Sequence, residues 1–327
     1  MNQLSRPSYK RGPVRTLAKL ADVLEITEAQ LRSLASNASA MYHHCPQLKK
    51  DGTARDTWDA HPQLKKLHEL VNRRFLRLVE FPLYLQGGIR DRAVPRDYVG
   101  HVAIHAGAEC AIALDIADFF PSITEAKVFD IWRSFFRFSE EVADTLTKLT
   151  TKDGKPPQGA KTSNYLANLV FWRSEHELVR RLHSLGWRYS RLTDDVTVSK
   201  LAHPTPREEA KICSTVIGLI HREGFVIKRS KLKVHRQNRP MTLNGLVANV
   251  RPALPKAERN KIRAEVDSLA HHLGQEKNPD KPLVRRTLGR LAKLSRFHQG
   301  KASSLKSGLP GNVYQLVVER SRKKRSN

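Results

Sequence analysis

The strongest constraint in the sequence is a pair of apolar, strand-like segments that carry aspartates at their ends. Residues 109–116 (ECAIALDI) form a nearly all-apolar run typical of a buried strand, and Asp115 lies near its end. Residues 187–200 (WRYSRLTDDVTVSK) predict a strand, a tight turn and a second strand, with Asp194 and Asp195 at the turn. Carboxylates in such places cost free energy unless a positive charge neutralises them.

A pair of Mg²⁺ ions is the natural candidate for that positive charge. Magnesium prefers a few carboxylates together with phosphate oxygens and water. Two such ions ~3.5–4 Å apart can stabilise the attacking and leaving oxygens of an in-line phosphoryl displacement. An Asp-Asp dipeptide at a turn is weak evidence by itself, because aspartate is a favoured turn residue. The assignment therefore depends on what the rest of the chain provides.

The charge of the chain points to a polyanionic partner. Its 327 residues include 58 Lys and Arg against 32 Asp and Glu, a formal net charge of +26. Nucleic acid is favoured over an anionic membrane, because no long basic amphipathic helix with a Trp or Phe face is apparent. The sequence has neither a membrane-spanning apolar run nor a secretion signal, so we expect a cytoplasmic protein. The three widely separated cysteines predict reduced thiols.

The other patterns predict an α+β chain in which strands are interspersed with helices and a basic helical module follows. Residues 14–37 predict two helices with a break between them, where Thr27 and Gln30 fit a capping box. This pair could be a helix-turn-helix that reads DNA or a small helical support. Other helices are expected at 64–80, 125–150, 162–184, 205–223 and after 255, and strands at 224–235 and 242–250.

Several segments resemble the sequence motifs of reverse transcriptases, in collinear order over residues 14–250, which chance matches do not produce. In chain order they are the fingers motif (42–65), motif A (LDIADFFPSI, 114–123), motif B (PQGAKTSNYLANL, 157–169), motif C (RLTDDVTVS, 191–199), motif D (EGFVIKRSKLKVH, 223–235) and the primer-grip strand (TLNGLVAN, 242–249). The resemblance implies a right-hand polymerase fold with fingers, a palm (an antiparallel sheet packed by helices) and a small helical thumb.

The likeness also implies a division of the chain into three parts. Residues 1–107 would hold the N-terminal helices and the fingers. Residues 108–245 would form the palm with motifs A to D, with part of the fingers interleaved. Residues 246–327 would complete the primer grip and form a basic helical thumb with a flexible tail.

The family's catalytic residues map onto motifs A, C and D of this chain. Asp115 and Asp194 would hold the metal ions. Asp195 is a third candidate ligand, although the side chain of a neighbouring strand residue tends to the opposite face. Lys231, with Lys233 as a close competitor, fits the motif D lysine that donates a proton to pyrophosphate.

The nucleotide-binding residues implied by the likeness lie in the fingers and in motifs A and B. Lys49 and Arg55 would clamp the triphosphate of a dNTP, and the alternative is a solvated basic hairpin. Phe120 would exclude a ribose 2′-hydroxyl, and the alternative is core packing. Gln158 and Gly159 would lie against the incoming nucleotide and the template base, where glycine allows close backbone approach.

The thumb-like segment 285–296 carries basic residues at spacings that put several of them on one side. They are expected to bind RNA phosphates, and the alternative is a solvated charged face. These residues are Arg285, Arg286, Arg290, Lys293 and Arg296.

Size and one further motif favour the compact bacterial retron enzymes, which lack ribonuclease H, maturase and endonuclease modules. His105 lies ten residues before Asp115, as in the Asn-Ala-x-x-His pattern of retron enzymes, but His101 and Val102 replace the Asn and Ala. Leu192 stands where motif C usually begins with Tyr. That difference puts primer contact and fidelity in doubt rather than metal binding.

The retron likeness implies an RNA-directed DNA polymerase, a nucleotidyltransferase that uses dNTPs and two Mg²⁺ ions. Such an enzyme copies part of a cognate structured non-coding RNA from the 2′-OH of a guanosine and produces branched msDNA. A co-encoded effector protein, a role in antiviral defence and a higher-order assembly would accompany it. Two alternatives stay open: another defence- or intron-derived reverse transcriptase with a 3′-OH primer, and a non-catalytic basic RNA-binding scaffold. The intact aspartates argue against the scaffold.

Overall fold

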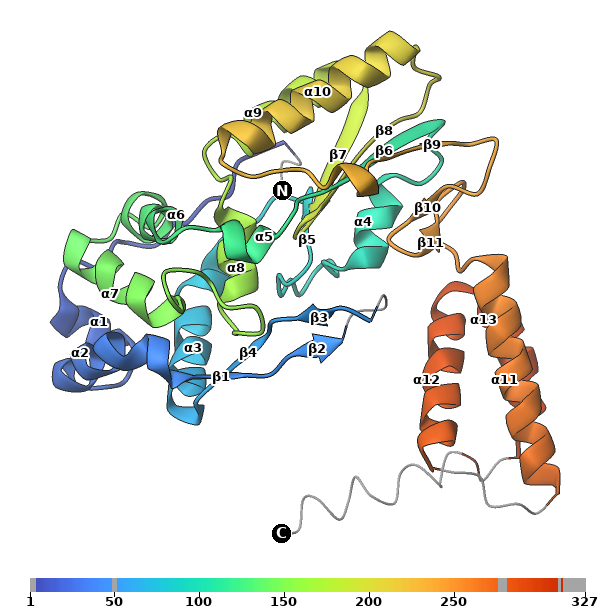
Figure 1. Ribbon diagram of the computed structural model, residues 1–327, viewed down its shortest axis with the longest axis horizontal. Helices are drawn as coiled ribbons and strands as arrows, with labels where there is room; N and C mark the ends of the chain where they lie inside the picture. Colours follow the sequence, from blue (N-terminus) through green and yellow to red (C-terminus); the bar gives the residue numbers. More distant parts are fainter. Residues whose placement is uncertain (1–3, 49–51, 276–280, 311–312, 314–327) are drawn as a thin grey trace. The chain divides into compact units, whose positions relative to one another are not determined.

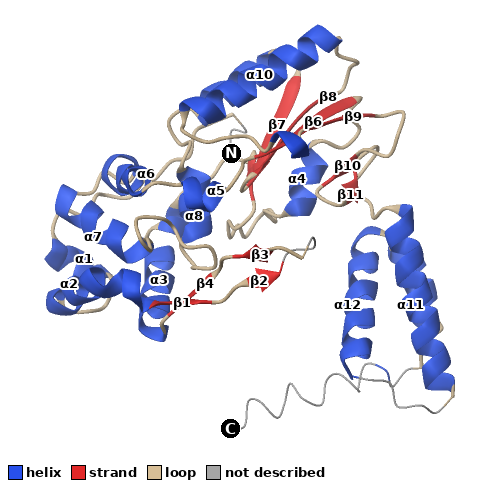
Figure 2. Cartoon of the chain, in the orientation of Figure 1, coloured by secondary structure: helices blue, strands red, loops and turns tan. Residues whose placement is uncertain are grey.

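The computed structural model describes residues 4–48, 52–275, 281–310 and 313 (Figures 1 and 2). The chain divides into two compact units, residues 1–237 and 238–327. Its mixture of helices and sheet confirms the predicted α+β class. The expected three-part division stays a prediction.

The first unit contains the helices and strands of residues 17–236. The helices are α1 (Leu17–Val23), α2 (Glu28–Asn37), η1 (Ala38–Met41), α3 (Pro62–Arg74), η2 (Leu76–Leu78), α4 (Tyr98–Ile104), α5 (Phe119–Ser122), α6 (Glu125–Asp130), the π-helix η3 (Ile131–Phe135), α7 (Glu140–Thr150), α8 (Ser163–Leu169), α9 (Glu175–Ser184), α10 (Pro206–Arg222) and η4 (Arg229–Lys231). The strands are β1 (Tyr42–His44), β2 (Gln47–Leu48), β3 (Ala54–Arg55), β4 (Trp58–Ala60), β5 (Leu85–Gln86), β6 (Cys110–Asp115), β7 (Trp187–Leu192), β8 (Asp195–Lys200) and β9 (Lys233–Arg236).

A five-stranded sheet of order β5-β7-β8-β6-β9 forms the centre of this unit. The pairs are antiparallel except β5 with β7, which is parallel. Helices α9 and α10 lie over one face, where Tyr189 contacts Glu175 of α9, and α4 packs on the other face against Ser190 (Figure 1). Because both faces are covered, nearly every side chain of β6 and β8 is buried, as the apolar runs predicted.

The N-terminal helices form a support that packs on α7. The predicted capping box is confirmed: Thr27 Oγ1 accepts from the backbone N–H of Gln30 at 3.2 Å, and Gln30 Oε1 accepts from the N–H of Thr27 at 2.9 Å. Leu20, Leu24 and Leu31 are fully buried in the apolar core that α1 and α2 share with α7. This burial matches the arrangement of a helical support.

Residues 42–60 form two short antiparallel ribbons, in which β1 pairs with β4 and β2 pairs with β3 (Figure 2). Arg55 lies in the returning strand, as predicted. Lys49, at the expected tip of the hairpin, lies outside the described residues.

Three of the expected helices are shorter or divided, and these predictions were wrong in extent. The helix expected at 64–80 ends at Arg74, because Phe75 has φ −130° and ψ −65°. The segment 125–150 breaks after η3, where Arg137 adopts a φ of +62°. The segment 162–184 forms two helices, α8 and α9, with a turn at 170–174.

Two expected strands also differ from the prediction. Within 224–235 only the last residues join the sheet, as β9, and η4 precedes them. The segment 242–250 is a tight hairpin of β10 (Thr242–Leu243) and β11 (Leu246–Val247) in the second unit. Its turn residues Asn244 and Gly245 have φ of +44° and +79°, typical of a two-residue hairpin turn.

The rest of the second unit is helical, as predicted for the residues after 255. Its helices are α11 (Lys256–Gly274), α12 (Lys281–Phe297) and α13 (Gln299–Ser307). The buried stripe of α11 at Ile262, Val266 and Leu269 and that of α12 at Leu291 and Leu294 supply the core of this unit. Within the described part of the chain, no helix is long and apolar enough to cross a membrane, and the cysteines are free thiols.

Candidate active site

Asp115 is the last residue of β6, where the sheet meets the loop that leads to α5. Its backbone oxygen accepts from the N–H of Lys228 at 2.8 Å, which ties the strand end to the segment before η4. The residue is 7% exposed, so its carboxylate lies at the rim of the core. A carboxylate in this position needs a nearby cation.

The β7–β8 hairpin brings the other two aspartates to the same edge of the sheet. Its turn consists of Thr193 and Asp194, with Thr193 at φ +59°, and the backbone oxygen of Asp194 accepts from the N–H of Ile116 at 3.0 Å. In the register of the sheet, Asp195 is the direct cross-strand partner of Asp115. Direct antiparallel partners point to the same face, so the sheet brings Asp195 beside Asp115.

One amine lies among these carboxylates. Lys231 Nζ donates to Asp115 Oδ2 at 2.6 Å, and the lysine side chain is 55% exposed. The pKa of Lys231 is raised, chiefly by this hydrogen bond, and the charges of Asp195 and Asp194 add to it. Burial raises the pKa of Asp194, and the nearby charge of Asp115 raises it further. The site thus gathers three acids beside the amine of Lys231.

The arrangement suits Mg²⁺ bound by a small number of carboxylates. No complete set of three His, Cys, Asp or Glu ligands is formed among the residues that the structure describes. Asp115 and Asp194 nevertheless lie close enough for the charge of one to raise the pKa of the other. Two close carboxylates fit the preference of Mg²⁺ for few protein ligands completed by phosphate oxygens and water.

The turn at Gln158 and Gly159 is held against strand β4. The backbone oxygen of Gln158 accepts from the N–H of Trp58 at 2.8 Å. Gly159 has φ +109°, and a Cβ at this position would lie 2.7 Å from the backbone oxygen of Trp58. Glycine is therefore required both by the backbone conformation and by the close approach of β4. Gln158 and Gly159 are half-buried and exposed, respectively.

The other nucleotide-binding candidates lie at different depths. Arg55 is exposed. Its positive charge acts on Asp194 and lowers the pKa of that carboxyl, in opposition to the larger raising effect of burial. Both rings of the Phe119–Phe120 pair are buried, at 3% and 8% exposure, with centroids 5.9 Å apart. Phe119 packs on Phe171 and Phe225, so it carries the core-packing role. A sugar contact by Phe120 stays a prediction.

Leu192, in the position of the usual Tyr, packs on a glycine of the neighbouring loop. It is the cross-strand partner of Asp195, which puts it in the same row as the aspartates. A Cβ at Gly87 would lie 2.8 Å from Leu192 Cδ1 and 2.9 Å from Thr193 Oγ1. The β7–β8 turn and the loop after β5 therefore fit together closely.

The basic residues of α12 differ in their availability to RNA. Arg290 forms an ion pair with Glu265, and Lys293 donates to Glu258 at 2.6 Å, so both are engaged within the second unit. The exposed members of the set are Arg285, Arg286 and Arg296.

Residue-level reasoning missed a buried arginine behind the β7–β8 turn. Arg191 is fully buried and donates to Glu175 at 2.6 Å and 3.0 Å, and to the backbone oxygen of Thr193 at 2.9 Å. It also donates to the backbone oxygens of Ala167 and Asn168 at the end of α8. One guanidinium therefore joins motif B, α9 and the turn of motif C. The available signal was weak, because Arg191 is one of two arginines in β7, which reads WRYSRL.

A second missed feature is a histidine network on the other face of the sheet. The rings of His101 and His105 in and after α4 share Ser190 Oγ at 2.7 Å and 2.8 Å. His101 also bonds Thr197 Oγ1 at 3.1 Å, and His105 bonds Ser199 Oγ at 2.8 Å. Burial lowers the pKa of His101 to about 3 and that of His105 well below its usual value, so both rings are neutral. They support the β7–β8 hairpin on the face of the sheet where α4 packs. Only their spacing from motif A was visible in the sequence.

Comparison with known proteins finds relatives of one kind along almost the whole chain. The chain is 30% identical to the Retron Se72 reverse transcriptase of Salmonella heidelberg, over 93% of this chain and 81% of that protein. It is 30% identical to the Retron Ec48 reverse transcriptase of Escherichia coli, over 94% and 79%. It is 25% identical to the Retron Ec86 reverse transcriptase of Escherichia coli, over 80% and 78%.

Comparisons with protein-family models and with solved structures add little to this identification. No protein-family model matches the chain. Among solved structures, telomerase from Candida albicans in complex with a TWJ fragment of telomeric RNA aligns with a TM-score of 0.46 at 9% identity, over 92% of this chain and 64% of that one.

Proposed function

Because this chain belongs to the retron reverse transcriptases and is an RNA-directed DNA polymerase, we propose that it copies part of a structured non-coding RNA from a 2′-hydroxyl primer. The observation that carries the catalytic part is the meeting of three carboxylates and one amine at the end of β6 and the β7–β8 turn. The 2′-priming and the branched msDNA product rest on the relatives. A co-encoded effector protein and a role in antiviral defence belong to the same proposal.

In this proposal Asp115 and Asp194 hold Mg²⁺, and Asp195 supports them from its place beside Asp115. Bound Mg²⁺ supplies charge stabilisation for the attacking and leaving oxygens of phosphoryl transfer. Lys231, 2.6 Å from Asp115, stands ready to give a proton to the leaving pyrophosphate. Arg55 adds a positive charge facing the triphosphate, within reach of Asp194.

In this proposal the helices and strands correspond to the palm, fingers and thumb of a right-hand polymerase. The five-stranded sheet serves as the palm and the β1–β4 ribbons as the fingers. Helices α11 to α13 serve as the thumb, where the exposed Arg285 and Arg286 bind RNA phosphates. Gly159 lets the fingers ribbon approach the motif B turn where the template base would lie.

The test is to express the gene with its flanking genomic DNA and to look for a short, abundant single-stranded DNA. Half of the nucleic acid is treated with ribonuclease and a debranching enzyme, and the Asp194→Asn variant is prepared in parallel. A band that requires Asp194 and shifts on debranching supports 2′-primed synthesis.

Other outcomes would change the proposal in defined ways. Absence of the band, together with Mg²⁺-dependent dNTP incorporation on an ordinary primed RNA, would reject 2′-priming and keep the polymerase. If the wild type gave neither the single-stranded DNA nor Mg²⁺-dependent dNTP incorporation, the assignment of these aspartates to a catalytic site would be contradicted. Normal yield from Asp194→Asn would remove that residue from the metal site.

A further inference from the structure

An arginine-rich groove lies in the first unit beside the loop that touches the catalytic turn. We call it the arginine groove and define it by five arginines around a cavity of about 650 Å³. Only Glu80 and Asp91 among its lining residues are acidic. Its arginines are Arg73, Arg77, Arg90, Arg92 and Arg96.

One arginine of the groove is structural. Arg96 is 6% exposed and donates to the backbone oxygens of Phe81, Pro82 and Leu85 at 2.7–3.1 Å, and to Asp91 at 2.9 Å. Its charge is balanced by Asp91. It fixes the loop 89–96 against residues 81–85 and so gives the groove a rigid wall.

Other arginines of the groove have capacity for a ligand. Arg90 and Arg92 are exposed, and their side chains have no hydrogen-bond or ion-pair partner within the described ranges. Arg77 pairs with Glu69 through one nitrogen, but its Nε is buried without a partner. Glu80 is already engaged by Lys10 at 2.7 Å, so it does not neutralise these cations. The groove therefore offers unpaired guanidinium groups.

The floor of the groove is apolar. Its apolar lining residues are Leu78, which is 40% exposed, and Phe81 and Ile89, which are 4% and 9% exposed. Guanidinium groups bind phosphate through paired N–H donors, and an apolar surface beside them accommodates unstacked bases. This combination fits single-stranded nucleic acid better than a small acid.

The groove is connected to the active site by hydrogen bonds. The backbone oxygen of Gln86 accepts from the N–H of Thr193 in the catalytic turn at 3.3 Å. Gly87 N–H in turn donates to the oxygen of Arg96 at 3.2 Å, and Arg90 N–H donates to the hydroxyl of Tyr165 in α8. From Gly87 to Arg92 the chain spans at most ~18 Å, so the groove begins within a few nucleotides of the aspartates.

We infer that the arginine groove binds the phosphate backbone of the RNA strand that has not yet been copied, as that strand approaches the catalytic turn. The inference rests on the proposed polymerase function and adds a phosphate-binding surface in the first unit to the basic helix α12. The exposed pair Arg90 and Arg92 contacts phosphate, and Arg96 positions the loop that carries them. The apolar floor receives bases in any sequence.

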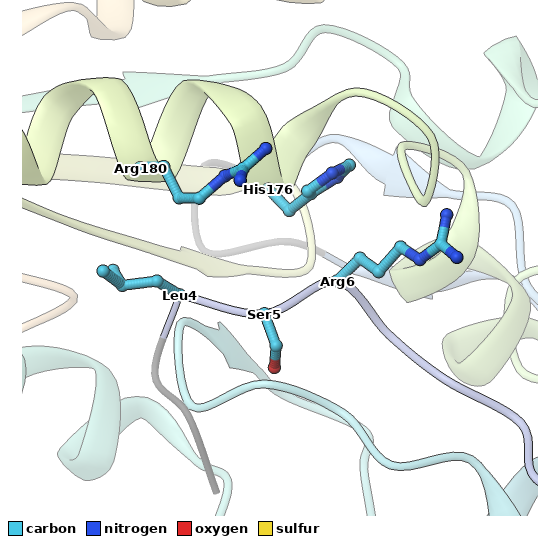
Figure 3. A pocket seen from close by; sticks show the side chains of 5 residues that line it. All are labelled: Leu4, Ser5, Arg6, His176 and Arg180. Carbon is cyan, nitrogen blue, oxygen red and sulfur yellow. The ribbon is translucent and has the colours of Figure 1, made fainter.

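The chain offers a matched control for this inference. A second basic pocket of about 390 Å³ lies between the N-terminal segment and α9, lined by Leu4, Ser5, Arg6, His176 and Arg180 (Figure 3). Arg6 and Arg180 are exposed, like the pair in the arginine groove. Helix α9 covers the face of the sheet opposite α4, away from the aspartate row. Removing these two arginines changes the net charge equally without touching the groove.

The experiment compares the full-length Arg90→Gln/Arg92→Gln and Arg6→Gln/Arg180→Gln variants with wild type. Binding of a fluorescent oligo(U) RNA is measured against salt concentration. Loss of two phosphate contacts should lower the slope of log K against log salt by ~1.4 and weaken binding on the order of tenfold at 0.1 M salt. The control pair should keep the wild-type slope, and Arg90→Lys/Arg92→Lys should restore most of it.

Primer extension locates the contact. On RNA templates with a 5′ overhang of about ten nucleotides, the groove variant should show a several-fold higher KM for template. With a one-nucleotide overhang its KM should equal that of wild type. Equal defects on both templates, an equal defect in the control pair or an unchanged salt slope would overturn the inference. Wild-type dNTP incorporation in the same assay shows separately whether the polymerase function holds.

Discussion

The buried pair of Arg191 and Glu175 provides the sharpest test of how the catalytic turn is supported. The change Glu175→Gln keeps the shape of the side chain but removes its negative charge. In the native protein the carboxylate is 2% exposed and accepts from Arg191 Nε at 2.6 Å, from Arg191 Nη2 at 3.0 Å and from the Tyr189 hydroxyl at 2.7 Å. The variant leaves a buried guanidinium without a counterion.

The magnitude follows from the burial of both partners. Removing one member of a buried ion pair typically costs about 3–5 kcal/mol, because the remaining charge stays desolvated. For a cooperative unit of the size of residues 1–237, each kcal/mol lowers Tm by ~2–4 °C. We therefore expect Glu175→Gln to unfold roughly 6–20 °C below the wild type.

The assay is thermal and urea unfolding of the full chain followed by circular dichroism. Asp144→Asn is the matched control, because Asp144 pairs with Lys148 on the surface, with both side chains about half exposed. Such an exposed pair contributes ~0.3–0.5 kcal/mol. If Glu175→Gln loses no more stability than Asp144→Asn, the view that this pair holds the turn is refuted.

Three further changes test the site and its surroundings. Gly159→Ala should lose about 1–3 kcal/mol of unfolding free energy, because the residue has φ +109° and a Cβ would come 2.7 Å from a backbone oxygen; a neutral result in urea unfolding would contradict this. Lys231→Met should lower kcat on the order of 10²-fold with dNTP KM little changed, whereas Lys233→Met should not; steady-state kinetics that rank the two the other way would reassign the proton donor. Because the folded pKa of His101 is about 3 and the unfolded value is near 6.5, the unfolded state binds more protons between these values. Stability should therefore be complete above pH 6.5 and fall as pH decreases, and in His101→Gln the urea midpoint should depend less on pH; an unchanged dependence would remove His101 as a cause.

Elements with local signals could be predicted from the sequence. Strand β6, the β7–β8 hairpin and α10 follow from an apolar run, from β-branched residues around a turn and from helical spacing after Thr205. The capping box at Thr27 needs only residues three apart. In each case the signal lies within a few neighbouring residues, so the local pattern contains it, although β6 finally pairs with the distant strands β8 and β9.

Elements shaped by distant contacts could not be predicted. The apolar pattern continues through 162–184, yet the chain turns at 170–174, where Trp172 and Arg173 both donate to Asp130. That acid lies on another helix, 42 residues away from Trp172 in sequence. A partner at such a distance leaves no mark on the local spacing.

The candidate site divides in the same way. The aspartates and Lys231 were found because motif spacing places them, and the structure brings all four together. The support around them was missed, because pairing Arg191 with a glutamate on α9 requires knowing how helices fold onto the sheet. The candidate catalytic groups lie in motifs, whereas the groups that position them come from separate elements.

The contact between Gly87 and Leu192 has a consequence for divergence of the family. Leu192 Cδ1 fills the space that a Cβ at Gly87 would occupy, and Gly87 has a φ of +82°, so a side chain at Gly87 would need both a strained backbone and a shift of Leu192. A bulkier aromatic residue at 192 would press on Gly87 and would be accommodated by a shift of the 87–96 loop. The two positions are expected to change together in evolution. Each such change would also displace the loop that leads to the arginine groove.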